Sequence, residues 1–440
     1  MGGVDFPAPM PTELTLPRYM TRFRCIAERC EDTCCAGLKI PVSPSDARRM
    51  QPALAAHPAQ AEHLRRSAGP ESDEGAGQTP FLPMHPDGTC AFLDPQRMCA
   101  LQRDHGEGAL PDVCATFPRV VTARDGHWEL SGSLACPEVV RLSLLAEDAM
   151  RPESLPFPSP RIPRPEAVRY LSRDPAEGYT FHAESVRAAL LRLLDREEHP
   201  LATRLALLGQ LAYAVDDFYF RGTDAFGEET RTGAEARLSE ALQRFDDPEA
   251  REAVHREFSR LALPGGPCVG LFTQVVKARM AARGGRVREW GRSVLESLGL
   301  GEGGPGDLDA AWSLYTRRWQ ALNAAQGPRL AQYFHHYVAH FLWRTSFTEF
   351  PSLLAYVFRL ALRVGLVRLM LVGHPMVVAL LEEPSSPQAL ESLELAVVET
   401  VQTVAKHVEQ SLEFLSLTEG LVGTGRGAET LGKVLVFASF

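Results

Sequence analysis

Cysteines are distributed very unevenly along this 440-residue chain, and their positions constrain its N-terminal third most strongly. Four lie in the segment RCIAERCEDTCC (24–35), four more follow by residue 136, and Cys268 alone lies beyond. A chain of this length can bury a sizeable core without cross-links, so the thiols are not needed to make it fold. The clustered set consists of Cys25, Cys30, Cys34, Cys35, Cys90, Cys99, Cys114 and Cys136.

The N-terminal segment indicates a reducing compartment. Its first twenty residues, MGGVDFPAPMPTELTLPRYM, lack the basic and then apolar regions of a secretory signal. We therefore expect a cytoplasmic protein, in which clustered cysteines serve as metal ligands rather than disulfides.

Charge and hydropathy disfavour two classes of partner. A net charge of -9 argues against nucleic acid, because binding to phosphate backbones depends on an excess of lysine and arginine. The most apolar run (353–373) is interrupted by Arg359, Arg363 and Arg368, which are costly in a bilayer. We expect this run to be a buried helix, and the partner to be a protein or a small ligand rather than nucleic acid or a membrane.

Proline content predicts the domain boundary. The segment RPESLPFPSPRIPRP (151–165) favours an extended conformation and cannot continue a helix. We expect a cysteine-cluster domain at 1–150, a linker at 151–165 and a helical domain at 166–440, where apolar residues recur at helical spacing.

The one clear strand pattern, RVVTARDGHWELS (119–131), predicts a hairpin turning at Arg124-Asp125-Gly126. The predicted fold class is therefore mainly α, with little β structure and that confined to the N-terminal domain.

Thiolate is a soft ligand, and four converging thiolates complete a zinc site or an iron–sulfur cluster. Eight thiols can supply one site with spares, or two sites. Adjacent Cys34 and Cys35 suit two neighbouring metals, or one ligand beside a redox or packing thiol. The alternatives to metal binding are packed free cysteines or a disulfide framework. A radical S-adenosylmethionine cluster in its usual form is disfavoured, because Gly37 stands where a third cysteine after Cys30 and Cys34 is required.

Several segments resemble the flagellin lysine-N-methylase family. The strongest are YMTRFRCIAERCEDTCCAGLKIPV (19–42), GTCAFLDPQRMCALQRDHGEGALPDVCATFPR (88–119) and SLACPEVVRLSLL (133–145). The order of the cysteines is similar, as are the Phe-Leu-Asp after Cys90 and the Phe-Pro-Arg after Cys114. A wider group of zinc- or iron-chelating CxxCxxCC domains shares part of this pattern. QYFHHYVAHFLWRTSFTEFP (332–351) and VAKHVEQSLEFL (404–415) resemble the family more weakly.

The resemblance implies transfer of methyl groups from S-adenosylmethionine to lysine side chains of flagellin. It also implies a cysteine-ligated iron–sulfur centre, for which we expect a [4Fe–4S] cluster with zinc as the alternative. All eight clustered cysteines correspond to the family's positions. Two departures are the wide gap in CIAERC (25–30) and the pair His335-His336, where relatives often carry asparagine or another polar residue.

No donor-binding motif is visible. The glycine-rich segments LGLGEGGPGD (298–307) and GLVGTGRG (420–427) lack the strand and helix of a dinucleotide-type fold, so we expect loops. Lysine methylation requires groups that align a neutral amine and accept its proton. Asp217, Tyr337 and His336 are the candidate catalytic residues, with packing or capping as the alternative role. At least one of Asp216 and Asp217 is expected to face inward.

A second class of function fits the same features. A non-catalytic metalloprotein would use the cysteine domain as a structural zinc site or a redox sensor, and the helical domain to bind a protein. Metal binding is common to both hypotheses, so a donor site is the discriminating feature.

Overall fold

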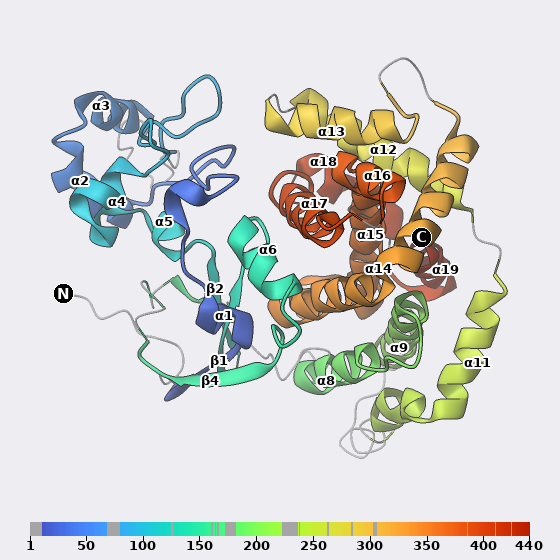
Figure 1. The fold of residues 1–440 in the computed structure, drawn as a ribbon. Coiled ribbons are helices and arrows are strands. Elements are labelled where there is room, and N and C mark those ends of the chain that lie inside the picture. The colour runs from blue at the N-terminus through green and yellow to red at the C-terminus, as the bar shows by residue number, and fades with distance from the viewer. Residues whose placement is uncertain are drawn as a thin grey trace. The chain divides into compact units, whose positions relative to one another are not determined.

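The computed structural model shows a predominantly helical chain with one small sheet among the residues that it describes (Figure 1). The chain forms two compact units: Met1–Leu142 with Arg151–Ser172, and Ser143–Met150 with Arg173–Phe440. The predicted fold class is confirmed, whereas the domain boundaries stay a prediction. The described residues are 11–67, 80–124, 127–159, 162, 164, 167–171, 182–221, 236, 238–261, 264–282, 285–301, 306–384, 386–409, 411–423 and 425–440.

The first unit contains a five-stranded sheet in the order β4-β1-β3-β2-β5. β1 is parallel to β3 and β2 is parallel to β5, while the β1–β4 and β2–β3 pairs are antiparallel. β4 lies within the proline-rich segment and occupies an edge, where a residue without an N–H is tolerated. The strands are β1 (Glu13–Pro17), β2 (Arg119–Arg124), β3 (His127–Gly132), β4 (Pro152–Pro156) and β5 (Arg169–Leu171).

The predicted hairpin is confirmed as the pair β2–β3. Arg124 lies opposite His127 at its closed end, while Asp125 and Gly126 lie outside the described residues. The Tyr19 hydroxyl accepts a hydrogen bond of 2.8 Å from the Gly132 N–H, which ties the segment after β1 to the end of β3.

Short helices of the first unit build a second core beside the cysteines. The longest of these, α2, begins with a capping box in which Ser43 and Asp46 bond to each other's backbone N–H groups. The helical segments are α1 (Arg18–Arg22), η1 (Ala27–Arg29), α2 (Pro44–Leu54), α3 (Pro58–Ser67), α4 (Ala100–His105), η2 (Glu107–Ala109) and α5 (Asp112–Thr116); α6 (Pro137–Leu144) follows the sheet hairpin.

The second unit is built around α15 (Leu353–Val372), which packs against α9, α14, α17 and α19. Its side chains are buried on nearly all faces, as expected for a central helix. The other segments are α8 (Ala183–Leu194), α9 (Leu201–Arg221), η4 (Arg244–Asp246), α11 (Pro248–Ser259), α12 (Gly265–Ala282), α13 (Arg286–Ser297), α14 (Leu308–Arg344), η5 (Phe347–Glu349), α16 (Pro375–Glu382), α17 (Ala389–Thr403), η6 (Val404–Val408), α18 (Leu412–Val422) and α19 (Gly427–Ser439).

The prediction that residues 353–373 form a buried helix is confirmed. The guanidinium of Arg368 lies 4.2 Å from the ring centroid of Trp319, and Arg359 and Arg363 lie over phenylalanine rings at 4.8 and 4.9 Å. Aromatic faces therefore accommodate the charges that interrupt this apolar run. In the described part of the chain, no helix by itself has the length and apolarity to cross a membrane; α15 and α16 meet the criterion only as a pair, bent by 58°.

Candidate metal centre

The two cysteine-bearing segments of the first unit pair directly with each other. Cys90 donates its backbone N–H to the Cys35 carbonyl at 2.7 Å, and Gly37 donates to Gly88 at 2.9 Å. Gly37 and Gly88 both have positive φ angles, which glycine adopts readily. These backbone hydrogen bonds hold Cys35 and Cys90 next to each other, although they are far apart in the sequence.

A tight turn returns the chain from Cys90 to Cys99. Asp94 accepts a bond from the Met98 N–H through its side chain, and Ala100 donates its N–H to the Phe92 carbonyl at 2.8 Å. Cys99 is then the residue that precedes α4. The turn therefore places both thiols of this segment on the same side of the unit as Cys35.

An ion-pair network positions the helix that carries Cys114. The Arg49 guanidinium lies 2.5 Å from carboxylate oxygens of both Asp46 and Asp112, and Asp46 also accepts the Asp112 N–H at 2.9 Å. Asp46 is 4% exposed, while the side chains of Arg49 and Asp112 are 30% and 27% exposed, so the network is only partly shielded from water. It fixes the start of α5 against α2, two residues before Cys114.

Five thiols line one cavity of about 80 Å³. The rest of its wall is mainly apolar and includes Leu82, Phe92 and Leu110. Such a wall excludes water and strengthens electrostatic interactions with whatever the thiols hold. The five cysteines are Cys34, Cys35, Cys90, Cys99 and Cys114.

The thiols of this cavity differ in acidity. A hydrogen bond from Cys35, assisted by backbone N–H groups of Leu101 and Gln102, lowers the pKa of Cys99 to about 6. Hydrogen bonds to Cys34 and Cys99, followed by burial, raise the pKa of Cys35, and burial also raises the pKa of Cys90 and Cys114. The lowered pKa of Cys99 favours its thiolate, which is the form in which sulfur binds metals.

The other three clustered thiols lie outside that cavity's lining. Cys136 directly precedes α6, and burial raises its pKa to about 12, with smaller contributions from Cys30 and Cys34. Burial likewise raises the pKa of Cys30, with smaller contributions from Cys34 and Cys25. Cys34 contributes in the same way to Cys90 and Cys114 of the cavity.

The donor chemistry of this region fits zinc or an iron–sulfur centre, because soft thiols converge on an apolar cavity. Within the residues that the structure describes, no three histidine, cysteine, aspartate or glutamate side chains already stand in metal-ligating geometry. To bind a metal ion, the thiol groups would therefore have to move closer together. Cys268 belongs to α12 of the second unit and is buried.

Each candidate catalytic residue of the second unit has a defined place. Tyr337 is buried in α14 and donates its hydroxyl to Glu409 at 2.8 Å. His336 donates Nδ1–H to the Leu144 carbonyl at 3.1 Å, and burial lowers its pKa. Asp217 is half-buried in α9. Tyr337 bonds to Glu409, whereas His336 bonds to Leu144 in a different segment. The two side chains are therefore not hydrogen-bonded to each other.

The expectation that an acid of the pair 216–217 faces inward is confirmed for Asp216. Its carboxylate accepts the N–H groups of Leu353 and Leu354 at 3.0 and 2.8 Å, at the start of α15. Asp216 is 3% exposed. Its role is to cap a helix, which satisfies N–H groups that have no partner within the helix.

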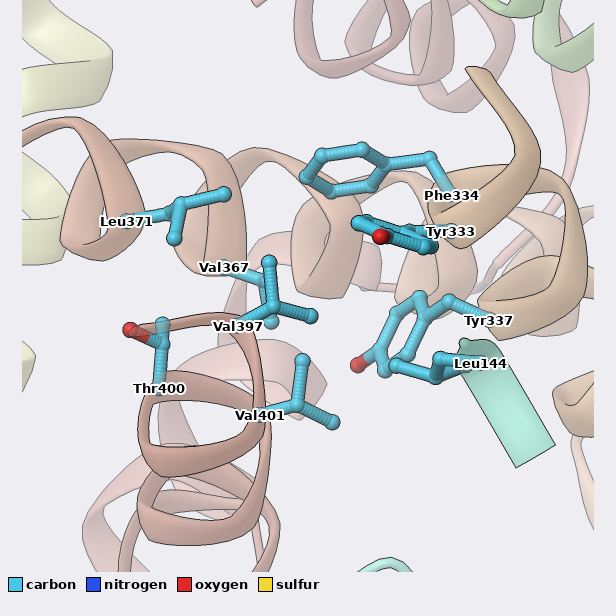
Figure 2. Close-up of a pocket in the computed structure, with 9 residues that line it drawn as sticks. All are labelled: Leu144, Tyr333, Phe334, Tyr337, Val367, Leu371, Val397, Thr400 and Val401. Carbon is cyan, nitrogen blue, oxygen red and sulfur yellow. The ribbon is translucent and has the colours of Figure 1, made fainter. Parts of the chain in front are cut away.

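A small apolar cavity of about 10 Å³ adjoins Tyr337 (Figure 2). Figure 2 shows Tyr333, Phe334 and Tyr337 of α14 on one side of it, and Val397 and Val401 of α17 on the other. This volume is about that of one water probe, so it holds no methyl donor in this form. Of the glycine-rich segment 420–427, which was predicted to be a loop, residues 420–422 end α18 and Gly427 begins α19, so the prediction is wrong for these four residues. Residue 424 of this segment and residues 302–305 of the other lie outside the described residues.

Sequence reasoning missed the partners of Tyr337. Glu409 follows the π-helical turn η6 and also lies 3.5 Å from the Arg363 guanidinium. Lys406, within that turn, is 5% exposed. The signal available in the sequence was the presence of Lys406 and Glu409 within the largely apolar segment VAKHVEQSLEFL, because buried charges need partners.

Two family models match the chain. The FliB lysine N-methylase C-terminal domain matches residues 187–437, and the CxxCxxCC family, a candidate zinc- or iron-chelating domain, matches residues 24–136. These ranges cover most of the helical unit and all eight clustered cysteines.

Individual proteins match over shorter stretches. The chain is 31% identical over 139 residues to a lysine-N-methylase of Salmonella typhimurium, covering 31% of this chain and 34% of that protein. It is 31% identical over 142 residues to the flagellar biosynthetic protein FliU of Salmonella muenchen, covering 31% of this chain and 80% of that protein. The match thus spans about a third of the lysine-N-methylase's length, and no solved structure matches. Because one family model covers more than half of its residues, this chain belongs to the FliB lysine N-methylase family.

Proposed function

We propose that this protein transfers methyl groups from S-adenosylmethionine to lysine side chains of a flagellin or a flagellin-like protein. The observation that carries the proposal is the match of residues 187–437 to the FliB lysine N-methylase C-terminal domain. The cysteine cavity adds support, because thiols are suitable ligands for the zinc or iron that the CxxCxxCC family is described as chelating. We place the reaction in the cytoplasm.

The reaction breaks the bond between the methyl carbon and the sulfonium sulfur of the donor, and forms a bond between that carbon and the lysine Nζ. The lysine amine must be neutral to attack, and the nitrogen releases a proton once the bond has formed. The other product is S-adenosylhomocysteine. The protein must therefore align two substrates, lower the pKa of the amine and remove one proton.

We assign candidate roles to three residues of the helical unit. Tyr337 offers a hydroxyl whose position is fixed by Glu409, and is suited to orient the amine. His336 is held neutral by burial, and Asp217 is half-buried; each is suited to receive a proton directly or through water. These roles remain part of the proposal.

The cysteines would hold the metal centre. When bound, a [4Fe–4S] cluster would supply one-electron chemistry, whereas zinc would close the fold of the first unit. The thiols from which its ligands would be drawn are Cys25, Cys30, Cys34, Cys35, Cys90, Cys99, Cys114 and Cys136.

The test is a methylation assay with anaerobically purified protein, flagellin and S-adenosylmethionine labelled in the methyl group. We expect label on flagellin lysines, located by peptide mass spectrometry, and production of S-adenosylhomocysteine. Protein that binds metal but neither binds the donor nor labels flagellin would instead support the alternative, a non-catalytic metalloprotein whose helical unit binds a partner.

A further inference from the structure

We propose that a cavity lined by three arginines in the first unit binds the phosphate group of a small molecule. This arginine cavity has a volume of about 120 Å³, and Arg119, Arg164 and Arg169 form part of its wall. Such binding goes beyond the proposed function and does not depend on it. Among the described residues that line the cavity, there is no clustered cysteine and no candidate catalytic residue.

The sheet of the first unit places two of these arginines. Arg119 is the first residue of β2, and Arg169 is the first residue of β5. The two strands are parallel neighbours, with Arg169 paired to Thr122, so both begin toward the same end of the sheet. Arg164 lies in the segment that leads into β5. The cavity is thus formed by the start of two adjacent strands and by the chain that approaches the outer one.

Contacts within the unit hold two of the arginine side chains in place. Arg164 donates its Nε–H to Asp112 at 3.1 Å and an Nη2–H to the Glu107 carbonyl at 2.9 Å, and its side chain is 12% exposed. The guanidinium carbon of Arg119 lies 5.5 Å from the ring centroid of Phe23, which is buried. Because these side chains are already ordered, they lose less conformational freedom when they bind a ligand.

The charge of the lining selects an anion. Three of the described lining residues are arginine, and none of them is aspartate or glutamate. Like charges around one cavity repel one another, whereas an anion between them is attracted to all three. Guanidinium groups keep their charge at every physiological pH and present paired N–H donors to the oxygens of a phosphate. Apolar side chains such as Val121 and Ile162 make up most of the remaining wall, which strengthens this attraction.

Volume and charge together favour a single phosphate group. A phosphate monoester carries about 1.5 to 2 negative charges at pH 7, so it uses several arginines better than a singly charged carboxylate does. The cavity is much larger than the space of about 10 Å³ beside Tyr337, yet too small to enclose a whole nucleotide. The net charge of -9 disfavours the phosphate backbone of a nucleic acid. The ligand class is therefore inorganic phosphate or a small phosphorylated molecule.

Calorimetric titration with inorganic phosphate tests this site. We would titrate the full-length protein, Arg119→Gln, Arg169→Gln and the control Arg66→Gln at constant ionic strength. Arg66 belongs to α3 of the same unit, and its side chain is 78% exposed. We expect saturable binding to the wild type and the control, and roughly tenfold or weaker affinity in each cavity variant, because each loses a charged donor. Equal affinity in all four proteins, or no saturable binding to the wild type, would overturn the proposal.

Hydrogen exchange of the wild-type protein avoids variants that fail to fold. Phosphate should slow exchange in peptides that contain β2 or β5, and leave peptides of α15 in the second unit unchanged. Slower exchange in α15 alone, or in neither region, would contradict a site in the arginine cavity.

A competition experiment tests the choice of phosphate. Sodium acetate supplies a carboxylate of single charge, so at equal ionic strength it should displace phosphate only weakly. Acetate that binds as tightly as phosphate, and depends equally on Arg169, would show that the cavity accepts carboxylates and would overturn the assignment to phosphate.

Discussion

The phenolic oxygen of Tyr337 lies 2.8 Å from Oε1 of Glu409, and this hydrogen bond joins the C-terminal part of α14 to the residue that follows the π-helical turn η6. Both side chains are buried, at 4% and 9% exposure. Burial and the neighbouring carboxylate raise the pKa of Tyr337 well above its ordinary value, so the phenol stays protonated and donates. π-helical turns are frequent at functional sites, which makes this pair the first to test.

Tyr337→Phe should reduce methyl transfer at least tenfold while leaving the metal content unchanged, because it removes the proposed orienting hydroxyl. Tyr333→Phe is the matched control: it lies one helical turn away, lines the same small cavity and donates to Glu394 at 3.2 Å. Initial rates with labelled S-adenosylmethionine would measure the difference. Equal losses in both variants would indicate that Tyr337 serves packing alone.

Asp216→Ala should lower the free energy of unfolding of the helical unit by about 1–3 kcal/mol, because the N–H groups of Leu353 and Leu354 lose their acceptor. Asp217→Ala should cost less stability, since Asp217 is half-buried in the same helix. Urea titrations followed by circular dichroism would compare them. A larger loss for Asp217→Ala would argue against the capping role assigned to Asp216.

Stability should fall as the pH is lowered from about 6.5 to 4, partly because of His335. Burial, followed by repulsion from Arg204 and His336, lowers the pKa of His335 from 6.5 to about 4, and the facing Asp195 is too exposed to compensate. Between these values the unfolded chain binds the proton and the folded chain does not, so acid favours unfolding, by on the order of 2–3 kcal/mol at pH 4.

His335→Gln should flatten this part of the pH profile of unfolding free energy and keep an acceptor for Arg204, which bonds to Nδ1 at 3.0 Å. Urea titrations at several pH values between 4 and 7 would measure it. An unchanged slope in the variant would show that other groups dominate this range.

Removing the metal should destabilise the first unit selectively. Metal binding contributes to folding free energy where the ligands are brought together only in the folded state. Hydrogen exchange after chelation should therefore increase in peptides around Cys90–Cys114, while peptides of α15 in the second unit stay protected. Equal exchange with and without chelator would contradict a folding role for the metal.

The sequence predicted features that are local or strongly periodic. The buried helix at 353–373 followed from length and hydropathy, and the β2–β3 hairpin followed from strand propensity around a turn signal. The placement of all eight clustered cysteines in the first unit could be predicted from their close spacing in the sequence. In each case, a few adjacent residues carry enough information to determine the local conformation.

Long-range pairing was not predictable in the same way. The parallel alignment of β1 with β3 joins Leu14 to Trp128, and no periodicity in either strand specifies that partner. The sequence indicated that one of two adjacent acids faces inward, but only the position of α15 selects Asp216. The π-helical turn likewise depends on how α17 packs, because each of its residues is compatible with an ordinary helix.

The strand order of the first unit has a consequence during synthesis. β1 begins at Glu13, yet it lies between β3 and β4, and the edge strand β5 ends at Leu171. The ribosome must therefore synthesise about the first 170 residues before the sheet can be completed, and at about 5–20 residues per second this takes roughly 10–30 seconds. All eight clustered thiols are translated before that point, so the nascent chain presents them to the metal supply, and to oxidants, before their protective fold is complete.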